Sequence, residues 1–265
     1  MSSFQVILQH IPVMLLVLSR ISGVFIFAPL LSSGAMPRQV RVYLAGAMTV
    51  AVYPAVDATH AIGMELSIWS LLPLMTQEVA IGAVVGLLAS IPLLALELSG
   101  VVMGQQLGLS IAAVLNPSLD IPGDNLGQLL FVGATLMYIA MGGMELVFGS
   151  LVNTFDAMPI GTPAAAAVIG RDTFEVITGL LDSGFDMAMR IAMPVVVIIF
   201  VETVIVGFIM KTVPSLNILS FGFPIRIILG VAVLAASITF VATTLHGELE
   251  FVFRTLHEWS LGGLR

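Results

Sequence analysis

The sequence predicts an all-α integral membrane protein, and three observations support this class. Hydrophobic residues make up 58% of the 265 positions, while charged residues make up only 9%, against roughly a quarter in an ordinary soluble domain. The mean hydropathy is +1.11. Apolar runs of about 20 residues, the length of a helix that crosses a bilayer, recur along the chain. A soluble fold of this length could not cover so much apolar side chain, because its surface must be mostly solvated.

Composition also excludes several classes of function. The net charge is −7 and dispersed, and Lys211 is the one lysine, so a nucleic acid would find no basic surface to bind. The absence of cysteine excludes disulfides, thiolate metal sites and thiol nucleophiles. Neither HExxH, GxSxG nor a pair of catalytic aspartates is present, so an intramembrane enzyme lacks support and no cofactor is predicted. The N-terminus lacks a basic region and a cleavage site, and we expect it to be a retained first span.

The predicted architecture is about six long hydrophobic helices arranged as hairpins. A seventh apolar run, 93–115, lies between Pro92 and Pro117 and turns glycine-rich, so hydropathy alone does not tell whether it spans, re-enters or lines a cavity. A low-complexity linker at 159–167 is the best boundary between two halves of the chain. The six runs that are long enough to cross are 11–31, 39–56, 68–92, 126–151, 183–210 and 217–245.

The few cations predict the orientation of the spans. Arg38 and Arg41 follow the first run, and Lys211 and Arg226 bracket the turn before the last run. Because short cytoplasmic loops are enriched in Lys and Arg, both turns should face the cytoplasm. The acidic turn around Asp57 should face outward, and six crossings would then leave both termini on the periplasmic side.

Six candidates for polar contacts between helices are ionisable residues in or beside the apolar runs. Each costs at least about 2.5–3.5 kcal/mol at bilayer depth, so each should face protein, water or an opposite charge. They form either a proton or substrate pathway, or a set of inter-helix ion pairs and groups hidden in an assembly. The second reading is favoured, because no Asp/Glu/His relay is evident. The residues are Arg20, Glu78, Glu97, Glu145, Arg190 and Glu202.

Glycines recur every fourth residue at Gly100, Gly104 and Gly108, and Gly82 and Gly86 repeat the spacing once. On a helix this spacing exposes a strip of backbone that a second helix can approach closely. The alternative is a segment too weakened by glycine to form a regular helix. Either interpretation places the region against protein.

The segment that follows cannot be one continuous helix, because Pro117, Pro122 and Gly123 interrupt it. Irregular backbone at membrane depth is tolerated only inside protein or along a wet cavity. This segment is therefore either an ordinary surface turn or a loop folded into a channel, and its residues alone do not decide between the two.

Residues 213–226 form a turn rich in Pro and Gly between two apolar runs, typical of the tip of a membrane-embedded hairpin. The segment closely resembles the C-terminal hairpin of the FliR family of flagellar biosynthetic proteins and its SctT-like counterparts in type III secretion. Two mild departures are Ser215, where Gln is frequent, and Asn116, where Asp is frequent. The resemblance extends along most of the chain through Arg20 with Pro29, residues 36–41, residues 104–108, Asn116 with Pro117, Phe155 with residues 158–161, and residues 192–195.

The resemblance implies one component of the flagellar type III export gate, a multi-pass protein of the bacterial inner membrane at the flagellar basal body. Members of the family assemble with several copies of FliP and FliQ, with FlhB at the cytoplasmic side, and pass unfolded flagellar proteins as substrates. Residues 1–180 would be a FliP-like part with a central plug loop, and residues 181–265 a FliQ-like C-terminal hairpin.

The resemblance also assigns roles to two segments. A pore plug or constriction would comprise Gly104, Gln105, Gln106, Leu107, Gly108, Leu109, Ser110, Asn116 and Pro117. A cytoplasmic hairpin tip would comprise Pro214, Leu216, Asn217, Phe221, Gly222, Pro224 and Arg226. The subunit would be structural and not catalytic. The alternative function is a proton-coupled secondary transporter of a small solute, against which stand the lack of an internal repeat and of a converging substrate site.

Overall fold

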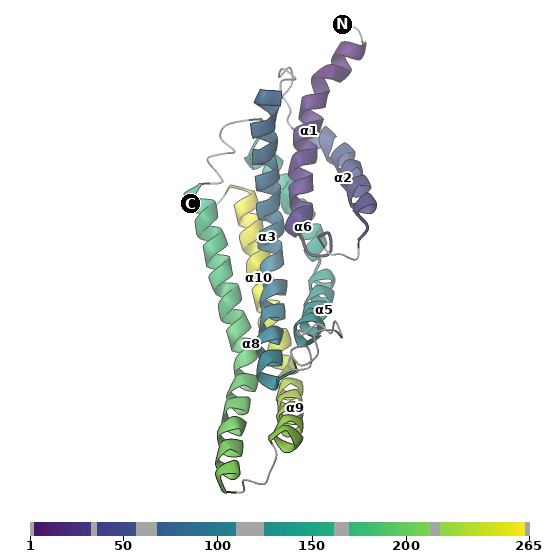
Figure 1. Cartoon of the computed structure of the whole chain (residues 1–265). Helices are drawn as coiled ribbons and strands as arrows, with labels where there is room; N and C mark the ends of the chain where they lie inside the picture. The colour runs from purple at the N-terminus through teal and green to yellow at the C-terminus, as the bar shows by residue number, and fades with distance from the viewer. Residues whose placement is uncertain are drawn as a thin grey trace. The chain divides into compact units, whose positions relative to one another are not determined.

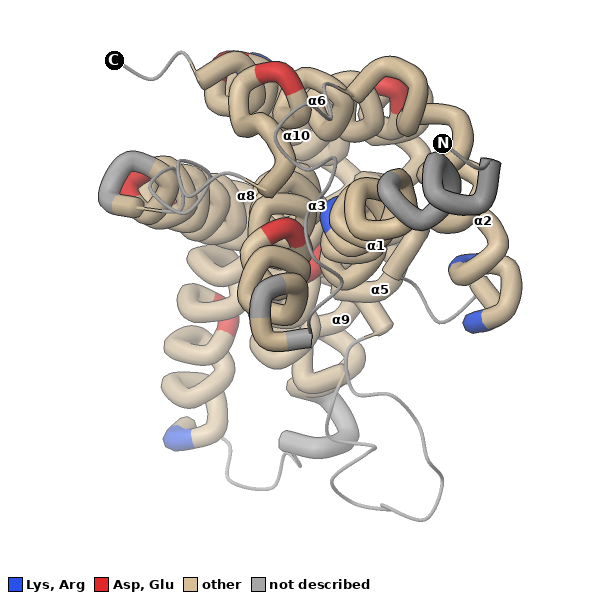
Figure 2. Tube along the Cα trace, turned by 90° about the horizontal axis from the view of Figure 1, so that it is seen from above, with Lys and Arg blue, Asp and Glu red and all other residues tan. Residues whose placement is uncertain are grey.

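The computed structural model describes residues 3–32, 36–56, 68–109, 125–161, 170–212 and 218–262, and within these ranges it is helical without a strand. The predicted all-α class is confirmed. Lys, Arg, Asp and Glu are few and scattered along the chain (Figure 2). The elements are α1 (Ser3–Phe27), α2 (Arg38–Val52), the 3₁₀ turn η1 (Tyr53–Ala55), α3 (Ile68–Leu107), α5 (Asn125–Ala140), α6 (Gly143–Ala157), α8 (Arg171–Thr212), α9 (Ile218–Ala236) and α10 (Ile238–Ser260) (Figure 1).

Three of the described helices are long and apolar enough to cross a membrane, through His10–Phe27 in α1, Leu71–Leu107 in α3 and Thr173–Thr212 in α8. Two bent pairs, α5 with α6 at 65° and α9 with α10 at 55°, raise the number to five if each pair forms one span. The chain is therefore a membrane protein of helical spans. The described residues contain three to five candidates instead of the six runs read from hydropathy.

The differences lie at the breaks between helices. The runs 68–92 and 93–115 join in α3, which continues through Pro92 to Leu107. Proline removes only one helical hydrogen bond, and the side chains of Leu88, Ile91 and Leu93 on either side of Pro92 are buried.

Other runs are shorter or broken. The run 126–151 divides at Gly142, which has a φ of +75° and precedes α6, and the run 217–245 divides after Ala236. The run 39–56 forms the 15-residue α2, less than the about 20 residues that a crossing needs. A hydropathy average does not detect the breaks at Gly142 and after Ala236, because apolar residues continue on both sides of each break.

The chain forms two compact units that alternate along the sequence. The first comprises Met1–Ile91, Tyr138–Leu181 and Glu250–Arg265. In it, a Cβ at Gly82 would approach the carbonyl oxygen of Arg20 to well under 3.0 Å, and one at Gly86 would approach that of Val24 to 2.7 Å. Helix α1 and the first half of α3 therefore pack with their backbones almost in contact, which only glycine permits.

The second unit comprises Pro92–Met137 and Asp182–Leu249. It holds the end of α3, most of α5, most of α8, all of α9 and the first half of α10. One side of α8 is buried at a spacing of three to four residues, including Met187, Ile191, Val195 and Ile199. The division of the chain at residue 180 into FliP-like and FliQ-like parts stays a prediction.

Candidate functional site

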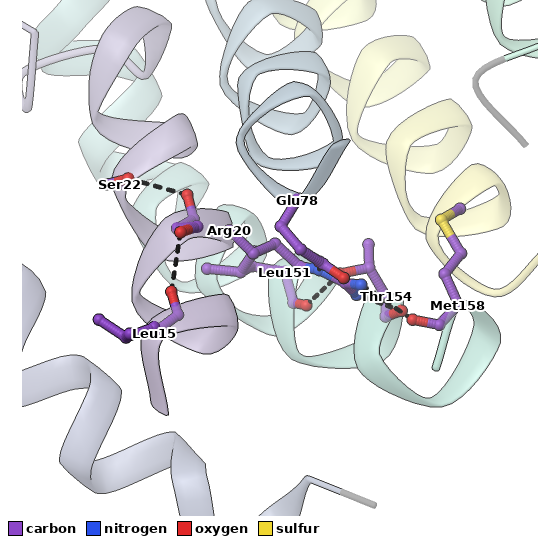
Figure 3. A network of polar contacts seen from close by, with 8 residues as sticks. Leu15, Arg20, Ser22, Glu78, Leu151, Thr154 and Met158 are labelled. Atoms are coloured by element: carbon purple, nitrogen blue, oxygen red, sulfur yellow. Dashed lines mark hydrogen bonds and ion pairs between the residues drawn. The ribbon is translucent and has the colours of Figure 1, made fainter. Parts of the chain in front are cut away.

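Arg20 of α1 is the largest fully buried side chain in the described residues, with 0% of its surface exposed. Its Nε donates to Oε2 of Glu78 in α3 at 2.5 Å. Its Nη1 and Nη2 donate to the carbonyl oxygens of Thr154 at 2.8 Å and Met158 at 2.9 Å. Figure 3 shows these groups converging from α1, α3 and the end of α6. The first unit is therefore joined by one charge-assisted network of three helices.

The end of α6 explains why the cation is accepted there. The last carbonyls of a helix lack intrahelical partners and carry the negative end of its dipole. No basic residue occupies the last turn of α6, and Arg20 supplies the cation from another helix. The ring of Phe155 lies 4.5 Å from Arg20 Cζ and covers the guanidinium face. A buried cation is thus neutralised by Glu78 and hydrogen-bonded by a helix end.

A second inter-helix pair lies in the second unit, between α8 and α9. Nε of Arg226 donates to Oε2 of Glu202 at 3.2 Å, and its Nη2 donates to Oγ1 of Thr203 at 2.7 Å. Glu202 is almost fully buried, whereas the Arg226 side chain is 28% exposed. The pair borders a cavity of about 190 Å³, which Val206, Gly207, Gly222 and Phe223 also line.

The structure also describes the other three predicted ionisable residues. Arg190 pairs with Asp186 on the exposed side of α8 at 2.6 Å, one turn apart in the same helix. Glu145 is exposed in the first turn of α6, where a carboxylate suits the helix dipole. Glu97 is half-buried in α3 and also has an interaction partner. Within the described ranges, no group of three or more His, Asp or Glu is placed to hold a metal ion.

The predicted plug begins at the end of α3. Residues 104–107 form its last turn, and Gly108 follows with a φ of +76°. The Gly108 amide donates to the carbonyl of Gln105 at 3.1 Å, and the Leu109 amide donates to that of Gly104 at 3.0 Å. This pair of bonds is the Schellman motif, in which a left-handed glycine ends a helix. Of the two interpretations of the glycine row, the helical face therefore extends to Gly104 and not to Gly108, because α3 ends at Leu107.

The other glycines of that row lie against the start of α5. A Cβ at Gly100 would approach Cα of Gly127 to 2.6 Å and the carbonyl oxygen of Leu126 to 2.8 Å. Among the described atoms, a Cβ at Gly104 would meet only Cβ of Leu126, at 3.7 Å. At Gly100, the backbones of α3 and α5 are therefore in close contact. Ser110, Asn116 and Pro117, the remaining residues of the predicted plug, lie outside the described residues.

The predicted hairpin tip is more helical than its sequence suggests. Helix α9 begins at Ile218 and runs through Gly222, Pro224 and Arg226, so the turn between α8 and α9 is shorter than residues 213–226. Proline is compatible with a helical φ and removes only one hydrogen bond near the start of the helix. Pro214, Leu216 and Asn217 lie outside the described residues, as does the side chain of Phe221.

Several residues of these contacts were not singled out from the sequence. Thr154, Thr203, Gly127 and Gly230 are examples. A threonine in an apolar helix carries no signal of its partner. A lone glycine inside a helix, in contrast, costs about 1 kcal/mol relative to alanine, so Gly127 and Gly230 could have been flagged as sites of close packing.

Comparison with known proteins identifies the family of this chain. The family model "Bacterial export proteins, family 1" matches residues 11–252. The chain belongs to this family. The match includes both charged pairs and the end of α3.

Individual relatives agree with this result. The flagellar biosynthetic protein FliR of Escherichia coli (strain K12) is 25% identical over 226 residues, which cover 85% of this chain and 84% of the relative. FliR of Bacillus subtilis (strain 168) is 24% identical over 251 residues, 94% of this chain and 95% of the relative. The Yop proteins translocation protein T of Yersinia pestis is 25% identical over 212 residues, 80% of each chain. The resemblance to the FliR family is confirmed, and the chain is a membrane component of a bacterial export apparatus.

Proposed function

We propose that the chain is a non-catalytic structural subunit of the flagellar type III protein-export gate. It forms with several copies of FliP and FliQ the channel for unfolded flagellar proteins, with FlhB at the cytoplasmic side. The observation that carries the proposal is the match to the export family along nearly the whole chain, with relatives named FliR at similar length. Two features of the helices support it.

The first feature is helix length. Helices α3 and α8 have 40 and 42 residues, or about 60 Å at 1.5 Å per residue. The hydrocarbon core of a bilayer is about 30 Å thick. Each helix therefore exceeds one bilayer crossing by about a factor of two. An assembly in which much of the apolar chain lies outside the bilayer plane, covered by other subunits, accommodates such lengths.

The second feature is the uncovered surface of α8. Of the apolar windows that define the candidate spans, that of α3 is 72% buried within the chain, whereas that of α8 is only 17% buried. Four phenylalanines of α8 are among its exposed apolar side chains, Phe174, Phe185, Phe200 and Phe208. The same helix exposes the Asp186–Arg190 pair, with side chains 57% and 66% accessible. Exposed charge is costly in lipid, so a mixed surface of this kind suits contact with partner subunits.

Within this channel, residues 104–117 act as a closure element and the tip between α8 and α9 lies at the cytoplasmic entrance. Gln105 and Gln106 are exposed at the end of α3. Their amides offer neutral hydrogen bonds, which suit a conduit that must pass many sequences without trapping any. Deletion of 110–117 should open an ion leak through the assembled complex, while unchanged conductance and export would count against the plug.

Copurification tests the function most simply. The tagged chain, extracted from membranes in mild detergent, should bring FliP and FliQ with it. A chain that purifies as a homogeneous single species without partners, and moves a small solute with protons in liposomes, would overturn the proposal and establish the transporter instead.

A further inference from the structure

The last residue of α3, Leu107, packs against Gly230 of α9. Leu107 is 2% exposed, and Gly230 lies buried in the middle of Ile218–Ala236. A Cβ at Gly230 would lie 3.1 Å from Cγ and 3.3 Å from Cδ1 of Leu107, and closer still to Cδ2. The whole isobutyl group of Leu107 therefore occupies the space that any larger residue at position 230 would need.

This contact cannot be relieved by moving one methyl group. The branch carbon Cγ lies within the crowded range together with both methyl groups, and the side chain is enclosed. A new rotamer would have to find space in a packed interior, and otherwise the end of α3 must move away from α9. Glycine is otherwise unfavourable in the middle of a helix, so the close approach is a physical reason for its presence at position 230.

The end of α3 is held at two further points. Gly100, two turns earlier, is in backbone contact with Gly127 near the start of α5. Gly108 ends the helix with a left-handed conformation and two capping hydrogen bonds. The Gly100 and Leu107 contacts belong to the same compact unit. The end of α3 is thus in contact with α5 at Gly100 and with α9 at Leu107.

We propose that Gly230 is a positioning residue that couples the C-terminal hairpin to the exit of α3 by accepting Leu107. Movement of α9 is transmitted to Gly108 and Leu109 through this contact. The coupling itself is a property of the chain. Its consequence for the channel rests on the proposed export function.

The absence of cysteine in the natural chain allows a direct test. Leu109→Cys introduces a single thiol two residues beyond Leu107, in the full-length protein in native membranes. The Leu109→Cys protein is the parent, and its rate of maleimide labelling is measured first. The same rate is then measured for the parent with Gly230→Ala, for the parent with both Gly230→Ala and Leu107→Ala, and for the parent with Gly247→Ala. Gly247 of α10 is a matched control, since a Cβ there meets no described atom within 4 Å.

Overpacking by one methyl group should raise the labelling rate with Gly230→Ala by about tenfold. Adding Leu107→Ala should return the labelling rate toward that of the Leu109→Cys parent, and Gly247→Ala should leave the labelling rate unchanged. Equal rates for Gly230→Ala and Gly247→Ala, or no relief in the double variant, would overturn the coupling.

If the Gly230→Ala protein does not accumulate in the membrane, the amount of each variant protein is compared instead of the labelling rate. Recovery of the protein by the added Leu107→Ala supports the contact. Failure of both, while Leu107→Ala alone accumulates, overturns it. Copurification of FliP and FliQ with the parent chain is scored separately, so that loss of the proposed function is distinguished from loss of the coupling.

Discussion

Arg20 is held by groups from two other helices, and the physics of burial shows why none of them can be removed alone. The guanidinium and the Glu78 carboxylate are 0% and 1% exposed. Charge in an apolar interior is tolerated only when it is paired and hydrogen-bonded. From the sequence, both residues could be selected as charges in apolar runs, and ion pairing could be expected. The carbonyls of Thr154 and Met158 could not be predicted, because backbone acceptors at a helix end leave no mark in composition.

Loss of one member of this network should be strongly destabilising. Arg20→Ala or Glu78→Ala should each lower the free energy of unfolding by about 3–5 kcal/mol, since each leaves its partner charge buried and unpaired. The loss is read as a lower unfolding temperature of the detergent-solubilised protein. The pair variant Arg20→Met with Glu78→Leu should cost less than either single change.

Arg190→Ala is the matched control for this prediction. It breaks an exposed ion pair within one helix, which is worth about 0–1 kcal/mol. If Arg20→Ala shifted the unfolding temperature no more than Arg190→Ala does, the buried network would not hold the first unit together.

Replacement of Gly108 by a residue with a side chain should destabilise the protein, because the backbone conformation there favours glycine. Its φ of +76° is left-handed, and an L-residue there costs about 1–2 kcal/mol. Gly108→Ala should therefore destabilise the protein, and Gly108→Asn should do so less, because asparagine tolerates this region better.

Gly133→Ala provides the comparison, since Gly133 of α5 has open space around its Cβ position among the described residues. That change should be neutral or stabilise by up to about 1 kcal/mol. Equal effects of alanine at positions 108 and 133 on the unfolding temperature would contradict the assigned cap.

The helices show which parts of the fold hydropathy can predict. The apolar run 183–210 lies inside the candidate span Thr173–Thr212 of α8, which begins about ten residues earlier than hydropathy predicted. The breaks at Gly142 and after Ala236, and the continuity through Pro92, depend on packing between helices, to which a window average is insensitive. Glycine spacing predicted close contact for Gly82 and Gly86, but it did not predict that their partner would be α1.

The contact of α1 with α3 gives a prediction at the scale of the element. Gly82→Ala places a Cβ under 3.0 Å from the carbonyl oxygen of Arg20. This is backbone, which cannot rotate away, so the two helices must separate at a cost of about 1–3 kcal/mol. The unfolding temperature should fall relative to Gly46→Ala in α2, where a Cβ meets no described atom within 4 Å. A Gly82→Ala protein as stable as the Gly46→Ala protein would contradict the close packing.

For the molecule as a whole, the unusual feature is that α8, the longest described helix, remains largely uncovered by the chain itself. Family membership makes the chain an export component, and the mixed apolar and charged surface of α8 suits partner subunits. Composition predicted a membrane protein but could not distinguish cover by lipid from cover by protein, because an apolar side chain is equally compatible with both.

Photo-crosslinking from α8 distinguishes these two environments. A photoreactive amino acid at Phe208, which is 75% exposed, should form adducts with a sister subunit in living cells. A matched probe at Val195, which is fully buried within the chain, should form no such adducts. The Phe208 adducts should contain FliP or FliQ and should disappear when the gene of the captured partner is deleted. Labelling of lipid alone at Phe208, in cells that still export flagellar proteins, would contradict it.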